Sequence, residues 1–586
     1  MKNHAKYFTL IFLIFLLQGN AQRRQKNKNL PKTNISKSPK LVVGIIVDQM
    51  RYDYLTRFWN HYGEGGFKRL AGQGFNCKNH HFNYAPTSTG PGHTSVYTGT
   101  TPSTHGIIGN NWYDKEINKS VYCASDDSYN SVGTNSDAGK MSPHRMLTTT
   151  ITDQLRLHTQ MQGKTIAVAL KDRGAVLPGG HTANAAYWFE GDDVGKWITS
   201  SYYMDALPKW VTNFNVSGKI QAYKKAWTTL KDISLYVESG PDNNPYEGLF
   251  ETESAPIFPH DTPNLLNKAK DFEIIKYTPW GNSITTDFAI ETIDKEDLGT
   301  DTTTDFLAVS YSSTDYVGHK FGVNSKEVQD TYLRLDLDLE RLLNTLDAKV
   351  GVGQYTVFLT ADHGAVHVPA FLADQKIPAG YIALEEAKNK LDEFLTYNYG
   401  TTDVVKNISN SQVFLDRKVI ANLDMDLDDV QEEVALELLS YDAMDKVYTG
   451  YQLWQNEYTK GIPYILQNGW HQKRSGDVLV VPKPAHISYP KTGSTHGSPM
   501  IYDTHVPLLF YGYGIKKGST VHRTEIPDIA PTIATMLGIA FPNGTTGRPI
   551  TAVLELKEVL LQIFPCGFSI FFYLQNSIKK YYAKEP

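Results

Sequence analysis

The stretch Leu41-Val42-Val43-Gly44-Ile45-Ile46-Val47, followed by Asp48, decides the fold class. It is a continuous apolar run of strand length, and a carboxylate follows it at once. A run that does not alternate with polar residues is typical of a strand buried on both faces, as in a parallel sheet covered by helices. The stretch therefore predicts an inner strand of a parallel sheet in an α/β protein.

Three further apolar runs have the same form and the same kind of ending. They occupy residues 166–170 before Lys171 and Arg173, residues 306–309 before Asp315, and residues 355–359 before Asp362 and His363. In an open parallel sheet, ligands bind beyond the carboxyl ends of the strands, where the loops converge. We therefore expect the charged and imidazole side chains after the four runs to form one site.

An amphipathic pattern predicts a helix over residues 326–349 that covers this sheet. Its apolar positions recur at helical spacing on one stripe, formed by Val328, Tyr332, Leu335, Leu339 and Leu342. The domain that carries the sheet is expected to span residues 41–550.

Two segments inside the domain lack the alternation of strand and helix and are predicted to be insertions. The first, residues 179–287, is rich in aromatic residues and is expected to lie near the site. Its small core is expected to contain Tyr202, Tyr203, Trp210 and Trp227. The second, residues 368–495, contains an acidic helical stretch at residues 423–439.

The composition limits the classes of partner and of metal site. The 586 residues carry 57 basic and 62 acidic side chains, a formal net charge of -5, which gives no general reason to expect nucleic acid or an anionic membrane as partner. The three cysteines, Cys77, Cys123 and Cys566, are too few for a disulfide scaffold. Cys77 and Cys123 either pair or remain free buried thiols. Any metal must therefore be bound by histidine and carboxylate, a set that suits zinc or manganese.

The two ends of the sequence carry distinct signals. Lys2 and Lys6, an apolar run at residues 7–17 and Gly19-Asn20-Ala21 predict a signal peptide over residues 1–21 and export to the periplasm or the medium. A basic linker is expected at residues 22–40. The apolar segment 559–574, in the atypical tail 551–586, is short and contains helix breakers, so no membrane span is predicted there. An oligomer contact, a docking strand and an altered reading frame remain alternatives for this tail.

Three local patterns carry candidate chemistry. Asp362-His363-Gly364 follows a predicted strand, and Asp315 and His319 are four residues apart, as in metal-binding pairs on one helix face. Thr89 stands before Gly-Pro-Gly at the start of a predicted helix, where the helix dipole favours an anion. Each pattern also has an ordinary explanation when taken alone: a polar turn at Asp362-His363-Gly364, a capped surface helix at Asp315 and His319, and a loop of small residues at Thr89. Together they supply a hydroxyl and the ligands of a cation that could activate it.

Seven pieces of the sequence, in order, resemble the alkaline phosphatase superfamily, and most closely its secreted bacterial members of the PafA type, whose nucleophile is threonine. The pieces lie between residues 41 and 550: Val47-Asp48, Pro86 to His93, His105 to Asn111, Lys171-Asp172-Arg173-Gly174, Asp315 with His319, Thr360 to Gly364, and Thr495-His496-Gly497. The resemblance implies a three-layer α/β/α fold with a mainly parallel central sheet and inserted cap segments.

The resemblance also implies two Zn²⁺ ions per chain and a role for each matched residue. Its ligand sets are Asp315, His319 and His496 for the first zinc, and Asp48, Asp362, His363 and Thr89 for the second. Thr89 would attack phosphorus to give a phosphothreonine intermediate, while the first zinc would stabilise the leaving alkoxide and then activate water. Asn110, Lys171 and Arg173 would hold the non-bridging phosphoryl oxygens.

The implied activity is hydrolysis of small phosphate monoesters. The additional positive charge of Lys171 and Arg173 favours a monoester, which carries one more negative charge than a diester. The main alternative activity is that of the phosphodiesterases of the same superfamily. The alternative for Lys171 and Arg173 is that they only form ion pairs with acidic residues on the surface. An inactive binding homologue is disfavoured because all six metal-ligand positions are occupied. No protein partner is predicted.

Overall fold

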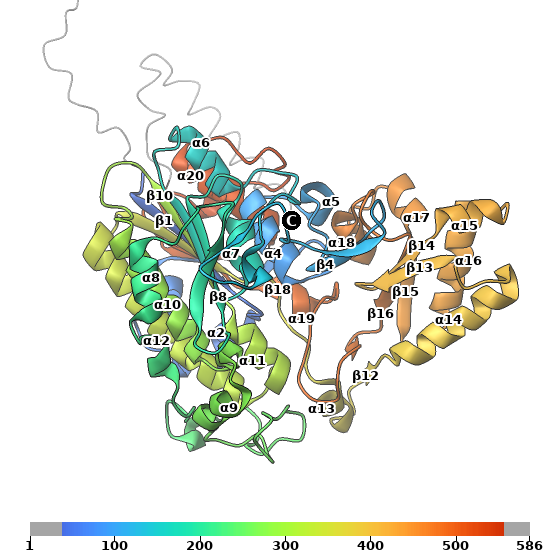
Figure 1. Cartoon of the computed structure of the whole chain (residues 1–586), viewed down its shortest axis with the longest axis horizontal. Helices are drawn as coiled ribbons and strands as arrows, with labels where there is room; N and C mark the ends of the chain where they lie inside the picture. Colours follow the sequence, from blue (N-terminus) through green and yellow to red (C-terminus); the bar gives the residue numbers. More distant parts are fainter. Residues whose placement is uncertain (1–37, 556–586) are drawn as a thin grey trace, which may run out of the picture. The chain divides into compact units, whose positions relative to one another are not determined.

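The computed structural model of the chain describes residues 38–555, and its main feature is a ten-stranded sheet (Figure 1). The strand order is β20-β2-β19-β11-β1-β10-β7-β8-β9-β6. The strands are β20 (Gly518–Thr520), β2 (Phe75–Cys77), β19 (Leu508–Gly512), β11 (Tyr355–Thr360), β1 (Leu41–Val47), β10 (Asp305–Tyr311), β7 (Thr165–Ala169), β8 (Ala185–Glu190), β9 (Lys196–Ser200) and β6 (Ser131–Val132).

The four strands predicted from the apolar runs are neighbours in the centre of this sheet. Strand β1 pairs in parallel with both β10 and β11, and β10 pairs in parallel with β7. All residues of these four strands are buried. The predicted α/β fold with a mainly parallel central sheet is confirmed, and the antiparallel pairs lie toward its two edges, β11 with β19 and β8 with β9.

Helices cover the sheet in two groups. Helices α10 (Trp280–Lys295) and α12 (Lys326–Leu346) pack together, and α10 contacts β10 and β7. Helices α4 (Thr89–Thr98), α6 (Ile151–His158), α7 (Asp172–Gly179) and α20 (Ile529–Leu537) form the second group, in which α7 also contacts β7 and β10. Figure 1 shows the groups on the two sides of the central strands. The predicted helix at 326–349 is confirmed, and the five residues of its apolar stripe are buried.

Helix α4 packs directly on the central strand β1. A Cβ atom at Gly44 would lie 2.3 Å from the Tyr97 hydroxyl and 2.6 Å from the Phe358 ring, so only glycine fits between helix and strand. The Tyr97 hydroxyl donates a hydrogen bond to the Gly44 carbonyl at 3.2 Å. This close packing fixes the helix that begins at Thr89 against the sheet.

The segment 179–287 was predicted to be an insertion with a small core of its own, but part of it belongs to the central sheet. Its first part supplies β8 and β9 of the central sheet, and Trp227 belongs to the main hydrophobic core, against which Tyr203 and Trp210 pack. The sequence conceals this because β9 follows β8 through a tight turn rather than through a covering helix. The range 179–287 therefore does not have a core of its own.

Residues 384–482, called the second lobe below, form a smaller unit inside the predicted insertion 368–495. Its sheet has the order β13-β14-β16-β15, with β13 (Val405–Ser409), β14 (Gln412–Leu415), β16 (Val478–Pro482) and β15 (Met444–Thr449). Helices α14 (Leu384–Tyr399), α15 (Arg417–Asn422) and α16 (Leu427–Leu439) accompany it, and α16 lies within the predicted acidic stretch. A separate cluster of buried apolar side chains, including Leu395, Val430 and Val434, forms its core.

Cys77 and Cys123 are both free and buried, which decides between the two alternatives for these thiols. Within residues 38–555, no helix is long and apolar enough to cross a membrane. The predicted signal peptide, nearly all of the basic linker and the apolar segment 559–574 lie outside the described residues, as does Cys566.

Candidate active site

The side chains that follow the central strands meet at one edge of the sheet. Asp48 follows β1, Lys171 follows β7, and Asp315 lies in helix α11 (Ser313–Phe321) just after β10. The Lys171 ammonium is 2.7 Å from Asp48 Oδ2 and 2.5 Å from Asp315 Oδ2. Asp362 and His363 follow β11, so all four strand ends contribute to the same place.

Asp48, Asp362 and His363 form the first group of candidate metal ligands. All three side chains are fully buried, and one ligand atom from each lies within 4.8 Å of the others. The His363 Nε2 atom is 3.5 Å from Asp48 Oδ1 and 3.7 Å from Asp362 Oδ2. These three atoms have no hydrogen-bond partner. Because buried polar atoms are normally paired, three unpaired ligand atoms that face one another fit a bound cation.

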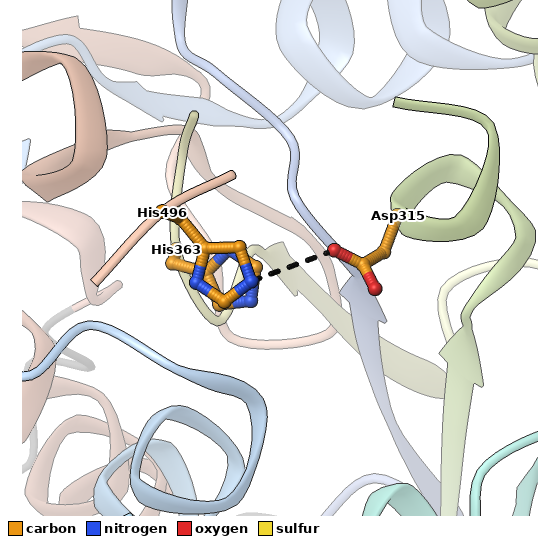
Figure 2. A group of neighbouring side chains, drawn as sticks. All are labelled: Asp315, His363 and His496. Carbon is orange, nitrogen blue, oxygen red and sulfur yellow. Dashed lines mark ion pairs between the residues drawn. The ribbon is translucent and has the colours of Figure 1, made fainter. Parts of the chain in front are cut away.

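Asp315, His363 and His496 form a second group with the same spacing. Figure 2 shows the rings of His363 and His496, which lie parallel with centroids 3.4 Å apart, facing the Asp315 carboxylate. His496 Nε2 is 3.7 Å from Asp315 Oδ1, and His319 Nε2 is 3.2 Å from the same oxygen. The structure therefore brings His319 to Asp315, as expected, and adds His363 as a residue common to both groups.

Each of the three histidines uses its Nδ1 atom to donate a hydrogen bond to a backbone carbonyl. His319 donates to Ser494 at 2.7 Å, His363 to Gly364 at 3.0 Å, and His496 to Thr87 at 2.7 Å. Since a carbonyl only accepts, the proton lies on Nδ1, and Nε2 keeps its electron pair when the ring is neutral. This is the tautomer that a metal-binding histidine needs.

The charges around the site shift the pKa values of its ligand candidates in different directions. Burial, together with the neighbouring His363 and His319, holds the pKa of His496 well below its usual value. Burial opposes ionisation of Asp315, but His319 and Lys171 lower its pKa overall. Burial and the carboxylates of Asp315 and Asp362 raise the pKa of Asp48, so this carboxylate is the one that gains most from a nearby cation.

Thr89 is the first residue of helix α4, whose first turn contacts both Asp362 and Asn110. A Cβ atom at Gly92 would lie 2.4 Å from the Asp362 carbonyl, so the first turn of the helix contacts this ligand. The Gly90 N–H donates to Asn110 Oδ1 at 2.7 Å. The His93 ring, 3.3 Å from the Asp362 carboxylate, donates to the Thr89 carbonyl at 2.9 Å. The hydroxyl-bearing residue is thus fixed by its own backbone beside the first ligand group.

Lys171 is buried beside the candidate ligands Asp48 and Asp315, and Arg173 follows it two residues later, in helix α7. Lys171 is 5% exposed, which rules out the surface ion pairs considered as an alternative. Burial lowers the pKa of Lys171, but Asp315 and Asp48 raise it above its ordinary value, so it stays charged. Arg173 Nη1 donates to the Tyr122 hydroxyl at 3.1 Å, and this hydroxyl donates to Asp172.

Gln49 is a residue of the site that the sequence did not indicate. Its backbone N–H donates to Asp362 Oδ1 at 3.1 Å, and its Nε2 donates to Asp315 Oδ1 at 2.6 Å, so it joins the two ligand groups. It has a φ of 64°, which is rare for a non-glycine residue and concentrates at functional sites. Its Oε1 lies 1.9 Å from where Gly318 would carry a Cβ, so glycine is required there. Its position directly after Asp48 was the only signal.

Comparison with known proteins identifies the relatives of this chain. The family described as "Type I phosphodiesterase / nucleotide pyrophosphatase" matches residues 42–505. Alkaline phosphatase PafA of Elizabethkingia meningoseptica is 46% identical over 89% of this chain and 96% of its own, and alkaline phosphatase PhoV of Synechococcus elongatus is 42% identical over 93% and 98%. A protein of Myroides odoratus named "Calcium-transporting ATPase" is also 46% identical, over 88% and 95%.

The crystal structure of wild-type PafA matches with a TM-score of 0.85 and 44% identity, over 90% of this chain and 100% of PafA. A structure of a PafA variant, with one threonine changed to serine and one asparagine, one lysine and one arginine changed to alanine, matches equally well. The chain therefore belongs to the type I phosphodiesterase/nucleotide pyrophosphatase family and has the fold of the alkaline phosphatase PafA.

Proposed function

We infer that this chain is an alkaline phosphatase, which hydrolyses small phosphate monoesters to an alcohol and inorganic phosphate. High identity to PafA and PhoV over most of the chain supports the activity. The observation that carries the choice of monoesters is the buried Lys171 ammonium between Asp48 and Asp315. A fixed positive charge at this point matches the second negative charge of a monoester.

We propose two Zn²⁺ ions per chain, held by the two groups of carboxylates and imidazoles. Asp48, Asp362, His363 and Thr89 would bind one ion, and Asp315, His319 and His496 the other. The unpaired ligand atoms and the Nδ1 hydrogen bonds support this assignment. Zinc at such a site supplies a Lewis acid that lowers the pKa of an oxygen nucleophile and neutralises developing negative charge.

Thr89 is the proposed nucleophile, with phosphothreonine as the intermediate. Its place at the N-terminus of α4 would bring a phosphoryl group on its hydroxyl close to the positive end of the helix dipole. The hydrogen bonds of His93 and Asn110 to the backbone of Thr89 and Gly90 hold the hydroxyl in place. A positioned nucleophile avoids the entropic cost of finding its target.

Asn110, Lys171 and Arg173, called the phosphate clamp below, are proposed to hold the non-bridging oxygens of the transferred phosphoryl group. The PafA variant described above changes the same four residue types as Thr89 and the clamp. Lys171 contributes a charge, and Arg173 a planar fork of donors whose Nε has no hydrogen-bond partner among the described residues.

Hydrolysis of phosphate diesters is the alternative, since the family itself is described by that activity. One experiment separates the two functions: the turnover of 4-nitrophenyl phosphate and of bis(4-nitrophenyl) phosphate is measured on one purified sample whose zinc content is also determined. A kcat/KM for the monoester at least 100-fold above that for the diester, with about two zinc ions per chain, is expected. A preference for the diester would contradict the proposal.

Export to the periplasm or the medium is proposed from the predicted signal peptide at residues 1–21. Sequencing the N-terminus of the protein recovered outside the cytoplasm tests it. A mature chain that begins near residue 22 is expected, and an intact Met1 would contradict cleavage.

A further inference from the structure

The second lobe contacts the region around Asn110 through one side chain in particular, that of Arg474. Its Nη1 atom donates to the Gly106 carbonyl at 2.5 Å and to the Arg145 carbonyl at 2.7 Å. Its guanidinium lies over the ring of Trp112, 5.5 Å from the centroid, which is a cation–π contact. Arg474 thereby holds three segments of the catalytic domain that are far apart in the sequence from the lobe.

The hairpin that Arg474 contacts carries the supports of two clamp residues. It consists of β4 (Asn111–Asp114) and β5 (Lys119–Tyr122), in which Asn111 pairs with Tyr122. Asn110 directly precedes β4, and its carbonyl accepts from the Cys123 N–H at 2.9 Å. Tyr122 ends β5, and its hydroxyl accepts from Arg173 at 3.1 Å. One end of the hairpin therefore orients both Asn110 and Arg173.

Arg474 reaches this end of the hairpin by two routes. The first passes through Gly106 to the short loop that ends at Asn110. The second passes through Arg145, whose carbonyl accepts from Arg474 and whose Nε donates to the Tyr122 carbonyl at 3.1 Å. A Cβ atom at Gly106 would lie only 2.6 Å from Arg474 Nη1, and its φ of 78° also favours glycine, so the approach is closely fitted.

A second contact of the lobe points to the same hairpin. Asn410 lies at the tip of the turn between β13 and β14, and its Nδ2 donates to the Asn111 carbonyl at 2.6 Å. Nearby, Lys115 Nζ donates to the Ser475 carbonyl at 2.7 Å. The lobe therefore contacts the hairpin both at Asn111, next to Asn110, and at its turn.

We propose that Arg474 is a positioning residue for the phosphate clamp, and that through it the second lobe sets how tightly the enzyme holds a phosphoryl group. The proposal rests on the proposed function of Asn110 and Arg173. Arg474 does not touch the substrate itself; it fixes the backbone from which Asn110 extends and the tyrosine that orients Arg173. A lysine cannot replace it, because its ammonium lacks the planar guanidinium that lies over the Trp112 ring while one of its nitrogens donates to two carbonyls.

The test compares Arg474→Lys with Arg417→Lys in the zinc-loaded, full-length enzyme. Arg417 is the matched control, since it is an exposed arginine of the same lobe that pairs with Asp477 inside the lobe. For Arg474→Lys, kcat/KM for 4-nitrophenyl phosphate should fall roughly 10- to 100-fold, as is typical when a remote change misplaces a binding group. Inhibition by inorganic phosphate should weaken in parallel, and the zinc content should stay the same. Arg417→Lys should match the wild type.

A double-mutant cycle separates positioning from a structural role. In an Asn110→Ala, Arg173→Ala background, Arg474→Lys should cost less than about 3-fold, because both groups that it positions are already lost. The same loss in both backgrounds would overturn the proposal. If instead Arg173→Ala alone leaves monoester turnover unchanged, the clamp and hence the proposed function are wrong, which is a different result.

A second variant covers the case in which Arg474→Lys lowers the melting temperature. Tyr122→Phe removes the hydroxyl that accepts from Arg173, at the end of the same route. Its loss in kcat/KM should also be confined to the background with an intact Arg173. Additive losses in this cycle would equally overturn the proposal.

Discussion

The candidate metal-ligand groups and the proposed phosphate clamp are built in different ways. Asp48, Asp362 and His363 come directly from the ends of buried central strands, so the core of the protein fixes them. Asn110 and Arg173 depend on the hairpin β4–β5 and on contacts such as those of Tyr122 and Arg474. Asp48, Asp362 and His363 are called the rigid half below, and they suit ions, which demand set distances. Asn110 and Arg173 are called the supported half, and their positions can be tuned from outside without disturbing the sheet.

The largest effect is expected where the two halves meet, at Thr89. Thr89→Ala should reduce phosphate monoester turnover by roughly 1,000-fold or more, because the nucleophile is lost while both halves remain. The zinc content should remain near two per chain. Thr89→Ser, which keeps a hydroxyl, is the control and should retain most of the activity. Turnover measured together with metal analysis decides, and normal activity of Thr89→Ala would refute the role of nucleophile.

Breaking the rigid half should remove metal and activity together. Asp362→Ala takes away a buried ligand that also accepts from the backbone of Gln49. We expect the loss of about one zinc per chain and a fall in turnover of roughly 100-fold or more. The control is Asp374→Ala, which removes a carboxylate that accepts from the exposed Tyr246 hydroxyl. Full zinc content in Asp362→Ala would contradict the ligand assignment.

Breaking the phosphate clamp should change specificity while the metals stay. The double variant Lys171→Ala, Arg173→Ala should lose roughly 100- to 1,000-fold in kcat/KM for a monoester, as when oxyanion donors are removed, and about tenfold less for a diester. Parallel assays with both substrates measure the ratio. Lys388→Ala, at an exposed lysine that pairs with Asp392, serves as control. Equal losses for both substrates would mean that the clamp does not select monoesters.

Gln49 lies between the ligand groups, so its variant should give a smaller, mixed effect. Gln49→Gly keeps the left-handed backbone conformation but removes the amide that donates to Asp315. We expect zinc to be lost to a chelator roughly 10-fold more readily, as for other residues that orient a ligand. Lys270→Gly changes another residue of positive φ, outside the site, and should have no such effect. Wild-type retention of zinc by Gln49→Gly would leave Gln49 with no part in orienting the ligands.

The smallest effect on catalysis is expected from the scaffold alone. Leu339→Ala deletes a buried side chain of α12 and should lower the free energy of unfolding by about 2–5 kcal/mol. Leu337, on the same helix, is 42% exposed, and its alanine variant should differ by less than about 0.5 kcal/mol. Both should keep the monoester-to-diester ratio of the wild type. Urea unfolding and the two assays measure this, and a changed ratio would show that α12 is coupled to the clamp.

The sequence predicted the rigid half better than the supported half for a physical reason. Runs such as 41–47 report burial on both faces, and the residue after each run is placed by the strand itself, so Asp48 and Asp362 could be found by position. Beside them, Gln49 gave no signal except its place directly after Asp48, because a left-handed backbone conformation of a glutamine leaves no pattern in composition or period.

Long-range support was invisible to the sequence as well. Arg474 donates to backbone carbonyls, and the Tyr122 hydroxyl accepts from Arg173. A backbone carbonyl is present at every residue, so no sequence pattern marks such a contact. The segment 179–287 was misread for a related reason: β8 is a buried run like the others, but its neighbour β9 follows without a helix. Family resemblance alone supplied the role of His496, whereas His319 was also indicated by its four-residue spacing from Asp315.

The spread of the ligands along the chain also bears on when the enzyme can take up its metal. Asp48 lies near the start of the domain and His496 near its end, with the whole second lobe encoded between His363 and His496. A nascent chain that has not yet emerged as far as residue 496 lacks His496 and cannot complete the group of Asp315, His363 and His496. If the chain crosses a membrane unfolded, zinc loading must therefore follow translocation, and the zinc supply of the destination compartment, not that of the cytoplasm, would set how much of the enzyme is active.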